Sequence, residues 1–368
     1  MKKLLLVSLA MFLFQACSSV YNEVTDSTGV FQLNRIDNIF FTNDNGLLIT
    51  GVYHNKLTII KTNSNFDTEW TKNNFEWGTN ASGSGWGSSF YSVHVTKMFQ
   101  QNDGTYVCVC SIEEGGDVVD YRVLAVELNA AGKQIRKVEF TNMNVVNALQ
   151  THDGGYVLFG TQLTKLNANY SQLWQKNIYD MIYFPARFIV TSDGGFAITG
   201  AYNSDQVYLK KYDSNGNELF SMNYKHNEYP FNEAGFDLVQ LYDNGYLIVG
   251  RTRNANSLND MDCQIIRTNL KGDTVWTKRF GDSTNDWLDR VVSYNQNEFI
   301  IQGTSGYPNE NPKSLLFKID YNGKILDSIK TQQFPVIVYS PLKYYIKAQN
   351  VDTAHVILSK IVEDKLFY

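Results

Sequence analysis

One octet of residues recurs along this chain and constrains its fold more than any other feature. The pattern is D-[GN]-G-[YFL]-x-x-x-G. Four close copies begin at Asp44, Asp153, Asp193 and Asp243, and three weaker copies lie near Asp103, Asn295 and Leu342. The copies are spaced by roughly 40 to 60 residues, a period that is typical of repeat architectures. We therefore expect seven similar supersecondary units.

Each octet is accompanied by three further runs of β-type residues. One run precedes it, such as RFIVT, and another follows it, such as VYLKKYD; after a turn comes a third run that often carries Trp, such as SQLWQK. Four short runs without a helical period predict a four-stranded antiparallel meander. Asp-Gly-Gly and Asp-Asn-Gly supply the positive φ that a tight hairpin requires. Seven meanders arranged radially predict an all-β fold, a seven-bladed β-propeller over residues 31–368.

The motifs D-x-N-G-x-x-x-[WF] and D-G-G-[YF] resemble the blades of bacterial propeller-repeat proteins. Such repeats are common among secreted lipoproteins of Bacteroidota and are related to pyrroloquinoline-quinone-type propellers. The resemblance covers about residues 35–368 and implies the fold, because its motifs specify turns. The docking motif of quinoproteins is incomplete here: Gly272 lies four residues before Trp276, but the Thr and Lys are missing. In sialidase Asp-boxes the Gly lies three residues before the Trp, so Gly272 departs from that spacing too.

The first residues are typical of a secretory signal peptide. Lys2 and Lys3 precede an apolar run from Leu4 to Phe14, which is too short to span a membrane. The FQAC sequence that ends at Cys17 resembles the lipobox of bacterial lipoproteins, with Phe in place of the commoner Leu. The alternative is an ordinary signal peptide followed by a chance cysteine.

The lipobox resemblance implies cleavage before Cys17 and acylation of that residue by palmitate-type chains. Two or three such chains anchor a protein stably. The expected organisation is a signal peptide over residues 1–16, a lipidated tether over 17–30 and the propeller after it. Because Ser18 rather than Asp follows the cysteine, we expect the outer membrane as the location.

Composition narrows the partners. A net charge of −5 argues against nucleic acid or an anionic membrane surface as partner. Cys108, Cys110 and Cys263 are expected to be buried thiols, with a pairing of Cys108 or Cys110 with Cys263 as the alternative. The histidines form no metal-binding or nucleophilic motif, so we expect no metal and no cofactor.

Connectivity predicts where function lies. In a meander the first and third turns share one end of the blade, and every short Gly turn falls there. The long connections fall at the other end: residues 73–90, 112–120, 225–234, 251–262, 280–286 and 304–313. Binding residues concentrate on variable loops carried by a rigid scaffold. This second end is therefore the predicted functional face.

Two segments of that face supply candidate ligand-binding residues. Trp77, Trp86 and Tyr91 lie in a Gly- and Ser-rich connection, and such aromatics stack on sugar rings or anchor a protein partner. The alternative is that the two Trp residues fold back over the rim.

The second segment is charged and lies further along the chain. It contributes Arg251, Arg253, Asp260 and Asp262, and the next blade connection adds Asp286 and Asp289. Arginine with carboxylates reads a polar ligand, and carboxylates alone bind Ca²⁺. The alternative is a solvated network of loop charges.

These observations lead to a first hypothesis, a non-enzymatic binding or assembly module that engages a glycan or an envelope protein. The alternative is an envelope carbohydrate-active enzyme, a hydrolase or lyase, that uses the carboxylates of the functional face. A third hypothesis, a quinone-dependent dehydrogenase, requires a bound cofactor. For ring closure, the segment near Val30 is a candidate for the outer strand of the last blade.

Overall fold

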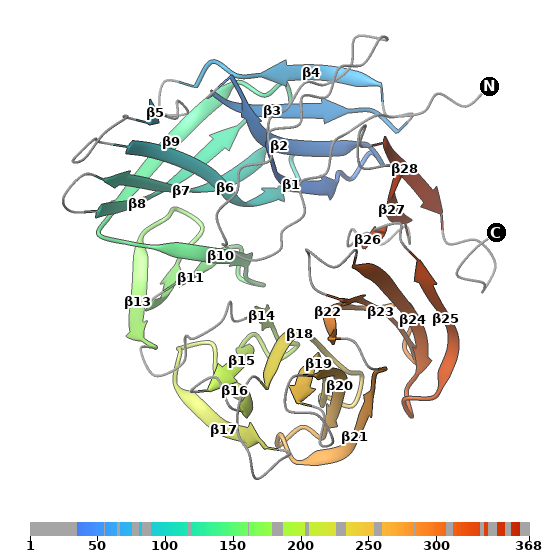
Figure 1. Ribbon diagram of the computed structural model, residues 1–368. Coiled ribbons are helices and arrows are strands. Elements are labelled where there is room, and N and C mark those ends of the chain that lie inside the picture. Colours follow the sequence, from blue (N-terminus) through green and yellow to red (C-terminus); the bar gives the residue numbers. More distant parts are fainter. Residues whose placement is uncertain are drawn as a thin grey trace. The chain divides into compact units, whose positions relative to one another are not determined.

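The computed structural model describes residues 35–54, 56–64, 67–75, 81–82, 90–115, 119–160, 162–178, 187–202, 206–225, 233–253, 260–282, 285–306, 312–331, 335–337, 344–349 and 355–360. Every regular element among these residues is a β-strand (Figure 1). They contain no helix long and apolar enough to cross a membrane. The chain divides into two compact units, Met1–Ala148 with Val338–Lys360, and Leu149–Ile337 with Ile361–Tyr368.

The first unit contains two antiparallel meanders, which we call blades 1 and 2. Blade 1 consists of β1 (Arg35–Phe41), β2 (Leu47–Tyr53), β3 (Lys56–Thr62) and β4 (Thr68–Lys72). Blade 2 consists of β6 (Phe90–Gln100), β7 (Tyr106–Gly115), β8 (Val119–Leu128) and β9 (Gln134–Thr141), with the short β5 (Ala81–Ser82) paired to β6. The first unit also contains β27 (Tyr344–Gln349) and β28 (His355–Lys360), which pair antiparallel, whereas β26 (Pro335–Ile337) lies within the bounds of the second unit.

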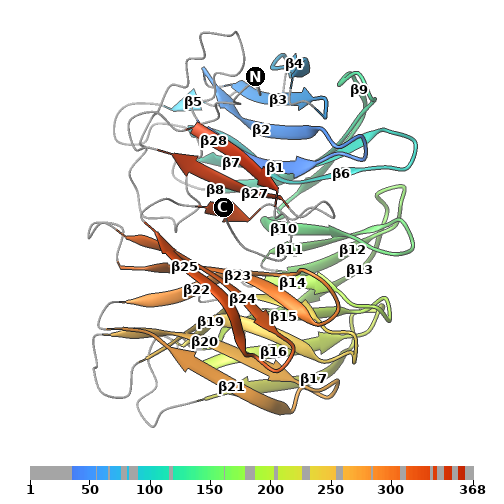
Figure 2. The same ribbon diagram turned by 90° about the vertical axis from the view of Figure 1, so that its right-hand side faces the viewer.

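Four further meanders follow, and all but the start of blade 3 belong to the second unit (Figure 2). Blade 3 is β10 (Val145–Gln150), β11 (Tyr156–Gly160), β12 (Gln162–Leu166) and β13 (Gln172–Asn177). Blade 4 is β14 (Arg187–Val190), β15 (Phe196–Tyr202), β16 (Gln206–Tyr212) and β17 (Glu218–Tyr224). Blade 5 is β18 (Ala234–Gln240), β19 (Tyr246–Arg253), β20 (Met261–Thr268) and β21 (Thr274–Phe280). Blade 6 is β22 (Asp286–Ser293), β23 (Glu298–Ser305), β24 (Lys313–Asp320) and β25 (Ile325–Thr331).

The fold class is confirmed: the chain is all-β and is built from four-stranded antiparallel meanders of the propeller type. Six of the seven expected blades contain all four strands, and the last sheet has three strands among the described residues. One connection differs from the sequence expectation. Residues 112–120 are largely strand, because β7 continues to Gly115 and β8 begins at Val119. The signal peptide, Cys17 and the segment near Val30 lie outside the described residues.

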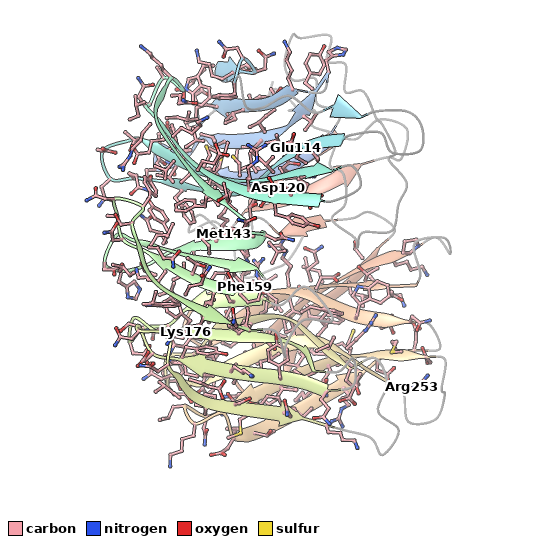
Figure 3. All side chains as sticks on the ribbon, turned by 90° about the vertical axis from the view of Figure 1, so that its left-hand side faces the viewer. Glu114, Asp120, Met143, Phe159, Lys176 and Arg253 are labelled. Carbon is pink, nitrogen blue, oxygen red and sulfur yellow. The ribbon has the colours of Figure 1, made fainter. Side chains whose placement is uncertain are left out.

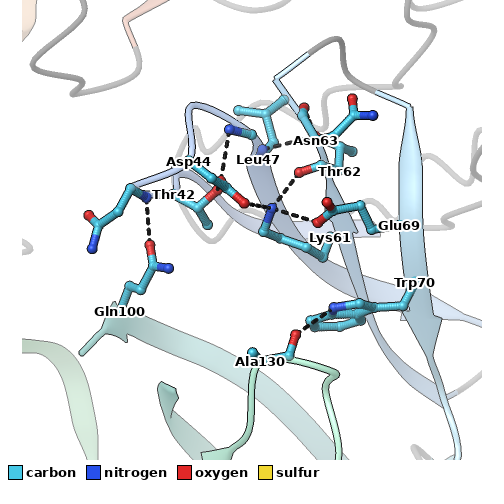
Figure 4. A network of polar contacts seen from close by, with 12 residues as sticks. Thr42, Asp44, Leu47, Lys61, Thr62, Asn63, Glu69, Trp70, Gln100 and Ala130 are labelled. Carbon is cyan, nitrogen blue, oxygen red and sulfur yellow. Dashed lines mark hydrogen bonds and ion pairs between the residues drawn. The ribbon is translucent and has the colours of Figure 1, made fainter. Parts of the chain in front are cut away.

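The aspartate that opens the octet is held by a buried cation from the third strand (Figure 4). In blade 1 the ammonium of Lys61 lies 2.7 Å from Asp44 and 2.9 Å from Glu69. It also donates to the carbonyl oxygen of Thr62, and the lysine itself is only 1% exposed. The equivalent pairs are Lys165 with Asp153, Lys211 with Asp193 and Arg267 with Asp243. In each of these four blades, the ion pair connects the first turn to the third strand.

The same lysine explains the second glycine of the octet. A Cβ at Gly46 would lie 2.8 Å from the Lys61 ammonium and deep inside van der Waals contact with the Thr62 carbonyl. The residue before it has a different requirement. Asn45 has φ of 63° and its equivalent Gly194 has φ of 78°, the left-handed region that Gly and Asn tolerate. The two positions are therefore fixed by two independent steric conditions.

The recurrent Trp of the fourth strand packs on the second Gly turn of the next blade. The indole nitrogen of Trp70 in β4 donates to the carbonyl of Ala130 in blade 2, 2.9 Å away. A Cβ at Gly132 in that turn would lie 2.8 Å from the Trp70 ring. The same arrangement joins Trp174 to Gly216, Phe220 to Gly272 and Trp276 to Gly323. The aromatic ring of one blade and the glycine of the next thus form one contact between neighbouring blades.

Hydrophobic clusters fill the spaces between successive blades. One cluster contains residues of blades 1 and 2, and others join blades 3 and 4, 4 and 5, and 5 and 6. Cys108 and Cys110 belong to the first cluster and Cys263 to the last. All three are free buried thiols, as the sequence predicts. Burial raises the pKa of each thiol well above its ordinary value, so they pack as small apolar side chains.

Candidate functional site

The charged candidate residues lie at one end of blades 5 and 6. We call this the loop end: there the second strand of a blade connects to the third, and the fourth connects to the next blade. Arg251 and Arg253 close β19, and Figure 3 shows Arg253 at this strand end. Asp262 is the second residue of β20, opposite Thr252 in β19. Asp286 begins β22. The opposite end, which carries the octet turns, is the turn end.

Three carboxylates approach one another at this loop end. The carboxylates of Asp262 and Asp286 both border Gly281, where a Cβ would lie 3.1 Å from Asp286 Oδ2 and still closer to Asp262. Glycine is therefore required at 281 for the two acids to sit side by side. Asp260 is 7% exposed and Asp286 is 3% exposed. The amide of Asp282 donates to Asp286 Oδ2 over 2.9 Å.

This crowding changes the proton affinity of the acids. Burial, together with the negative charges of Asp262 and Asp286, raises the pKa of Asp260. Burial also raises the pKa of Asp286, against the opposing effect of its hydrogen bond with Ser305. Among the described residues, no group of His, Cys, Asp and Glu is arranged to hold a metal ion. The arrangement favours proton-holding or ligand-binding acids.

The structure adds Arg187, Asp237 and Arg290, which the sequence analysis does not single out, to two of the candidate charges. The first strands of blades 4, 5 and 6 lie next to one another, as Figure 1 shows for β14, β18 and β22. Arg187 begins β14, Asp237 lies at the middle of β18, and Asp289 and Arg290 lie at the middle of β22; β19 adds Arg251. We call these five residues the first-strand charge group.

Asp237 is the centre of this group. It is 4% exposed. Its Oδ1 accepts from Arg187 Nε over 3.1 Å and from the Leu238 amide over 3.0 Å. Its Oδ2 accepts from the amide of Val291 in the next blade over 3.0 Å. Asp237 therefore links three successive first strands, and its oxygens are already engaged.

Asp289 and Arg290 lie beside Asp237, and burial shifts the pKa of each towards its neutral form. Burial raises the pKa of Asp289 to about 6, against the hydrogen bond from the Thr304 hydroxyl. Burial and the positive charge of Arg187 lower the pKa of Arg290. Asp289 occupies a β-bulge, since the pairing of β22 with β23 shifts between Leu288 and Arg290. A bulge re-aims side chains locally, so the usual alternation of strand faces does not hold for Asp289 and Arg290.

A sequence signal for this group exists. Each first strand is an apolar run interrupted by a charge at a similar position, as in RFIVT, FDLVQL and DRVVSY. A charge within an otherwise buried strand must find partners. Three successive blades with such charges indicate that the charges meet.

The side chains of the aromatic candidates lie outside the described part of the structure. Trp77 and Trp86 lie outside the described residues, and only the backbone of Tyr91 is described, in β6 opposite Ala81. Nearby, the acidic connection of blade 2 is neutralised by an arginine of β8. Arg122 lies 2.5 Å from Glu114 and 2.9 Å from Glu139; Figure 3 labels Glu114.

The chain is thus an all-β protein built from propeller-type blades, and blades 5 and 6 carry charged residues at their loop end. No family model matches the chain, and no curated protein matches it. Solved structures are similar to it. BamB from Moraxella catarrhalis is 11% identical, with 88% of this chain and 85% of that chain covered and a TM-score of 0.46. A protein of unknown function from Bacteroides caccae is 14% identical, covering 67% and 81%, with a TM-score of 0.38. BBS1N in complex with ARL6DN is 13% identical, covering 82% and 79%, with a TM-score of 0.45.

Proposed function

We propose that this protein is a lipid-anchored, non-enzymatic binding or assembly module of the outer membrane. In this proposal a seven-bladed ring presents its loop end to a protein or glycan partner. One observation carries it: the charges at the turn end repeat from blade to blade, whereas those at the loop end of blades 4 to 6 do not. Charges that recur from blade to blade stabilise the scaffold. Charges that do not recur in this way indicate a surface specialised for binding.

The membrane anchor rests on the lipobox resemblance at Cys17. Cells that express the full chain, supplied with an alkyne analogue of palmitate, should label the protein and place it in the outer-membrane fraction. Cys17→Ser should abolish the label and release the protein from the membrane. A variant that kept both label and location would contradict the anchor.

The partner surface is tested by crosslinking in intact cells followed by purification and mass spectrometry. We expect the double variant Arg253→Gln with Asp262→Asn to lose the partner, because both changes fall at the loop end. The control double variant Arg136→Gln with Asp103→Asn removes the same charges from exposed positions on blade 2. Trp77→Ala with Trp86→Ala should also weaken capture. Equal capture by all of these variants would contradict a loop-end surface.

A second candidate is a carbohydrate-active hydrolase or lyase. The observation that favours it is the raised pKa of Asp260 beside Asp262 and Asp286, because acids of raised pKa donate protons in such reactions. Asp260→Asn, Asp262→Asn or Asp286→Asn should then abolish turnover. A panel of envelope polysaccharides from which the unaltered protein releases no product would remove this candidate.

A further inference from the structure

Arg290 is a partly buried cation of blade 6 that no described residue engages directly. It makes no hydrogen bond and no ion pair within 4.0 Å to the part of the chain that the structure describes. The charges that act on it are those of Arg187, Asp237 and Asp289. Removing a cation from bulk water is costly unless an opposite charge or several acceptors replace the water. None of the Arg290 nitrogens is among the buried side-chain atoms that lack a partner, so they reach solvent, where an anion can replace water.

The neighbouring carboxylates do not fill that role. Asp237 already accepts three hydrogen bonds, one from Arg187 and two from backbone amides. Asp289 accepts from the Thr304 hydroxyl and, because burial raises its pKa to about 6, holds its negative charge weakly. Both acids are thus committed to other donors.

The charge balance of the first-strand charge group is positive. Arg187, Arg251 and Arg290 carry three positive charges, and Asp237 and Asp289 carry at most two negative ones. Arg251 contributes to the field at Asp289, and its guanidinium lies 5.4 Å from the centre of the Phe236 ring. That ring contact is within cation–π range and holds Arg251 at the loop end of β18.

We propose that Arg187 and Arg290 bind an anionic group of the ligand, a carboxylate or a phosphate, beside the first strands of blades 4 to 6. Guanidinium is suited to this chemistry, since its planar N–H groups match two oxygens of either anion. Asp237 holds Arg187 through Nε, which leaves its terminal nitrogens for the ligand. This inference rests on the proposed binding function and names the chemistry of the ligand.

The test is isothermal titration of the purified protein at constant ionic strength with inorganic phosphate and, separately, with succinate. We expect saturable binding of at least one anion, and the preferred anion identifies the group. Arg290→Gln and Arg187→Gln should each weaken binding at least tenfold. Arg136→Gln on exposed β9 is the matched control and should leave binding unchanged. No saturable binding, or binding unaltered in either arginine variant, would overturn the proposal.

A variant of opposite effect guards against misfolding of the arginine variants. Asp289→Asn removes a negative charge next to Arg290 without changing the size of the side chain. It should tighten anion binding about threefold or more, which a purely structural role of the group would not produce. Unchanged or weaker binding by this variant would contradict the site even if Arg290→Gln fails to fold.

The outcome is separable from that of the proposed function. If the protein captures its partner through the loop end but binds neither anion, the anion site fails and the binding module stands. If both anions bind as expected while loop-end variants keep full partner capture, the anion site stands and the proposed partner surface fails.

Discussion

The two ends of blades 4 to 6 use the same residue type in opposite ways. At the turn end, burial alone would raise the pKa of Asp193, but hydrogen bonds from Lys211, from Thr191 and from the Gly195 amide outweigh it and lower the pKa to about 2. At the loop end, burial raises the pKa of Asp260 and of Asp286, and within the first strand of blade 6 it raises the pKa of Asp289 to about 6. Ionised aspartate therefore stabilises the fold at one end and strains it at the other.

The difference separates scaffold from site. The turn-end pair recurs in blades 1, 3, 4 and 5 with one cation for each carboxylate. The loop-end acids Asp260, Asp262 and Asp286 instead crowd one another. Groups whose proton affinity is shifted by burial and by like charges gather at functional sites. Crowded carboxylates at the loop end lower the stability of the fold. The loop end is therefore the better candidate for a surface that has been retained for binding.

The largest expected effect is on the turn end, where an added methyl group disrupts the packing of the octet. Gly195→Ala places a methyl against the carbonyl of Tyr212 and 2.6 Å from the Lys211 ammonium, so backbone and lysine must both move. We expect a loss of about 3 kcal/mol in the free energy of unfolding, the upper range for overpacking. Gly194→Ala is the matched control: its φ is 78°, but no atom lies within 4 Å of the added Cβ, and it should cost about 1 kcal/mol. Equal losses in urea unfolding would refute the steric account.

The second prediction concerns the pH dependence of stability that Asp289 causes. The pKa of Asp289 rises from 3.8 to about 6 on folding, so the folded state binds this proton more tightly than the unfolded state. Stability is then highest below about pH 4 and falls as pH rises towards 6. At about 1.4 kcal/mol per pKa unit, reduced for partial exposure, the loss is about 2 kcal/mol. Asp289→Asn should remove this slope and stabilise the protein by a similar amount at pH 7.5, measured by urea unfolding across pH.

The third prediction returns to the turn end. Lys211→Met keeps the buried stem and removes the ammonium that serves Asp193. Because the Asp193 side chain is 55% exposed, water solvates the remaining carboxylate, and we expect a cost of only about 1.5 kcal/mol, between values for surface and buried pairs. This contribution should be present above pH 4 and vanish as pH falls towards 2. Lys210→Met, next on the strand, is the control and should change stability by less than about 0.5 kcal/mol.

The sequence predicted the strands and the octet turns because both depend on short-range patterns. Alternation of apolar runs gives strands, and Asp-Gly-Gly gives the turn. The lysine partners were not predicted, since Lys165 and Lys211 lie 12 and 18 residues from their aspartates. Nothing in a single strand marks them as buried cations.

The loop-end group was predicted only in part, for a different physical reason. Asp260, Asp262 and Asp286 were found because charges in connections between strands stand out in the sequence. Asp289 was expected with Asp286 in a connection between blades, but it lies in a bulge within β22, where the two-residue alternation of strand faces breaks down. Asp237 was missed because its partners come from two other blades, and the fit between blades is a tertiary property.

The smallest expected effect gives the sharpest test of the comparison, because it is one of sign. Asp262→Asn removes one of the negative charges that raise the pKa of Asp260 while keeping the shape of the side chain beside Gly281. We expect stability at pH 7.5 to rise by up to about 0.5 kcal/mol and the pKa of the Asp260 carboxyl, followed by NMR, to move down. Asp193→Asn at the turn end should destabilise, because it deprives Lys211 of its partner. If both substitutions destabilised the protein, the two ends would not differ in the way their carboxylates indicate.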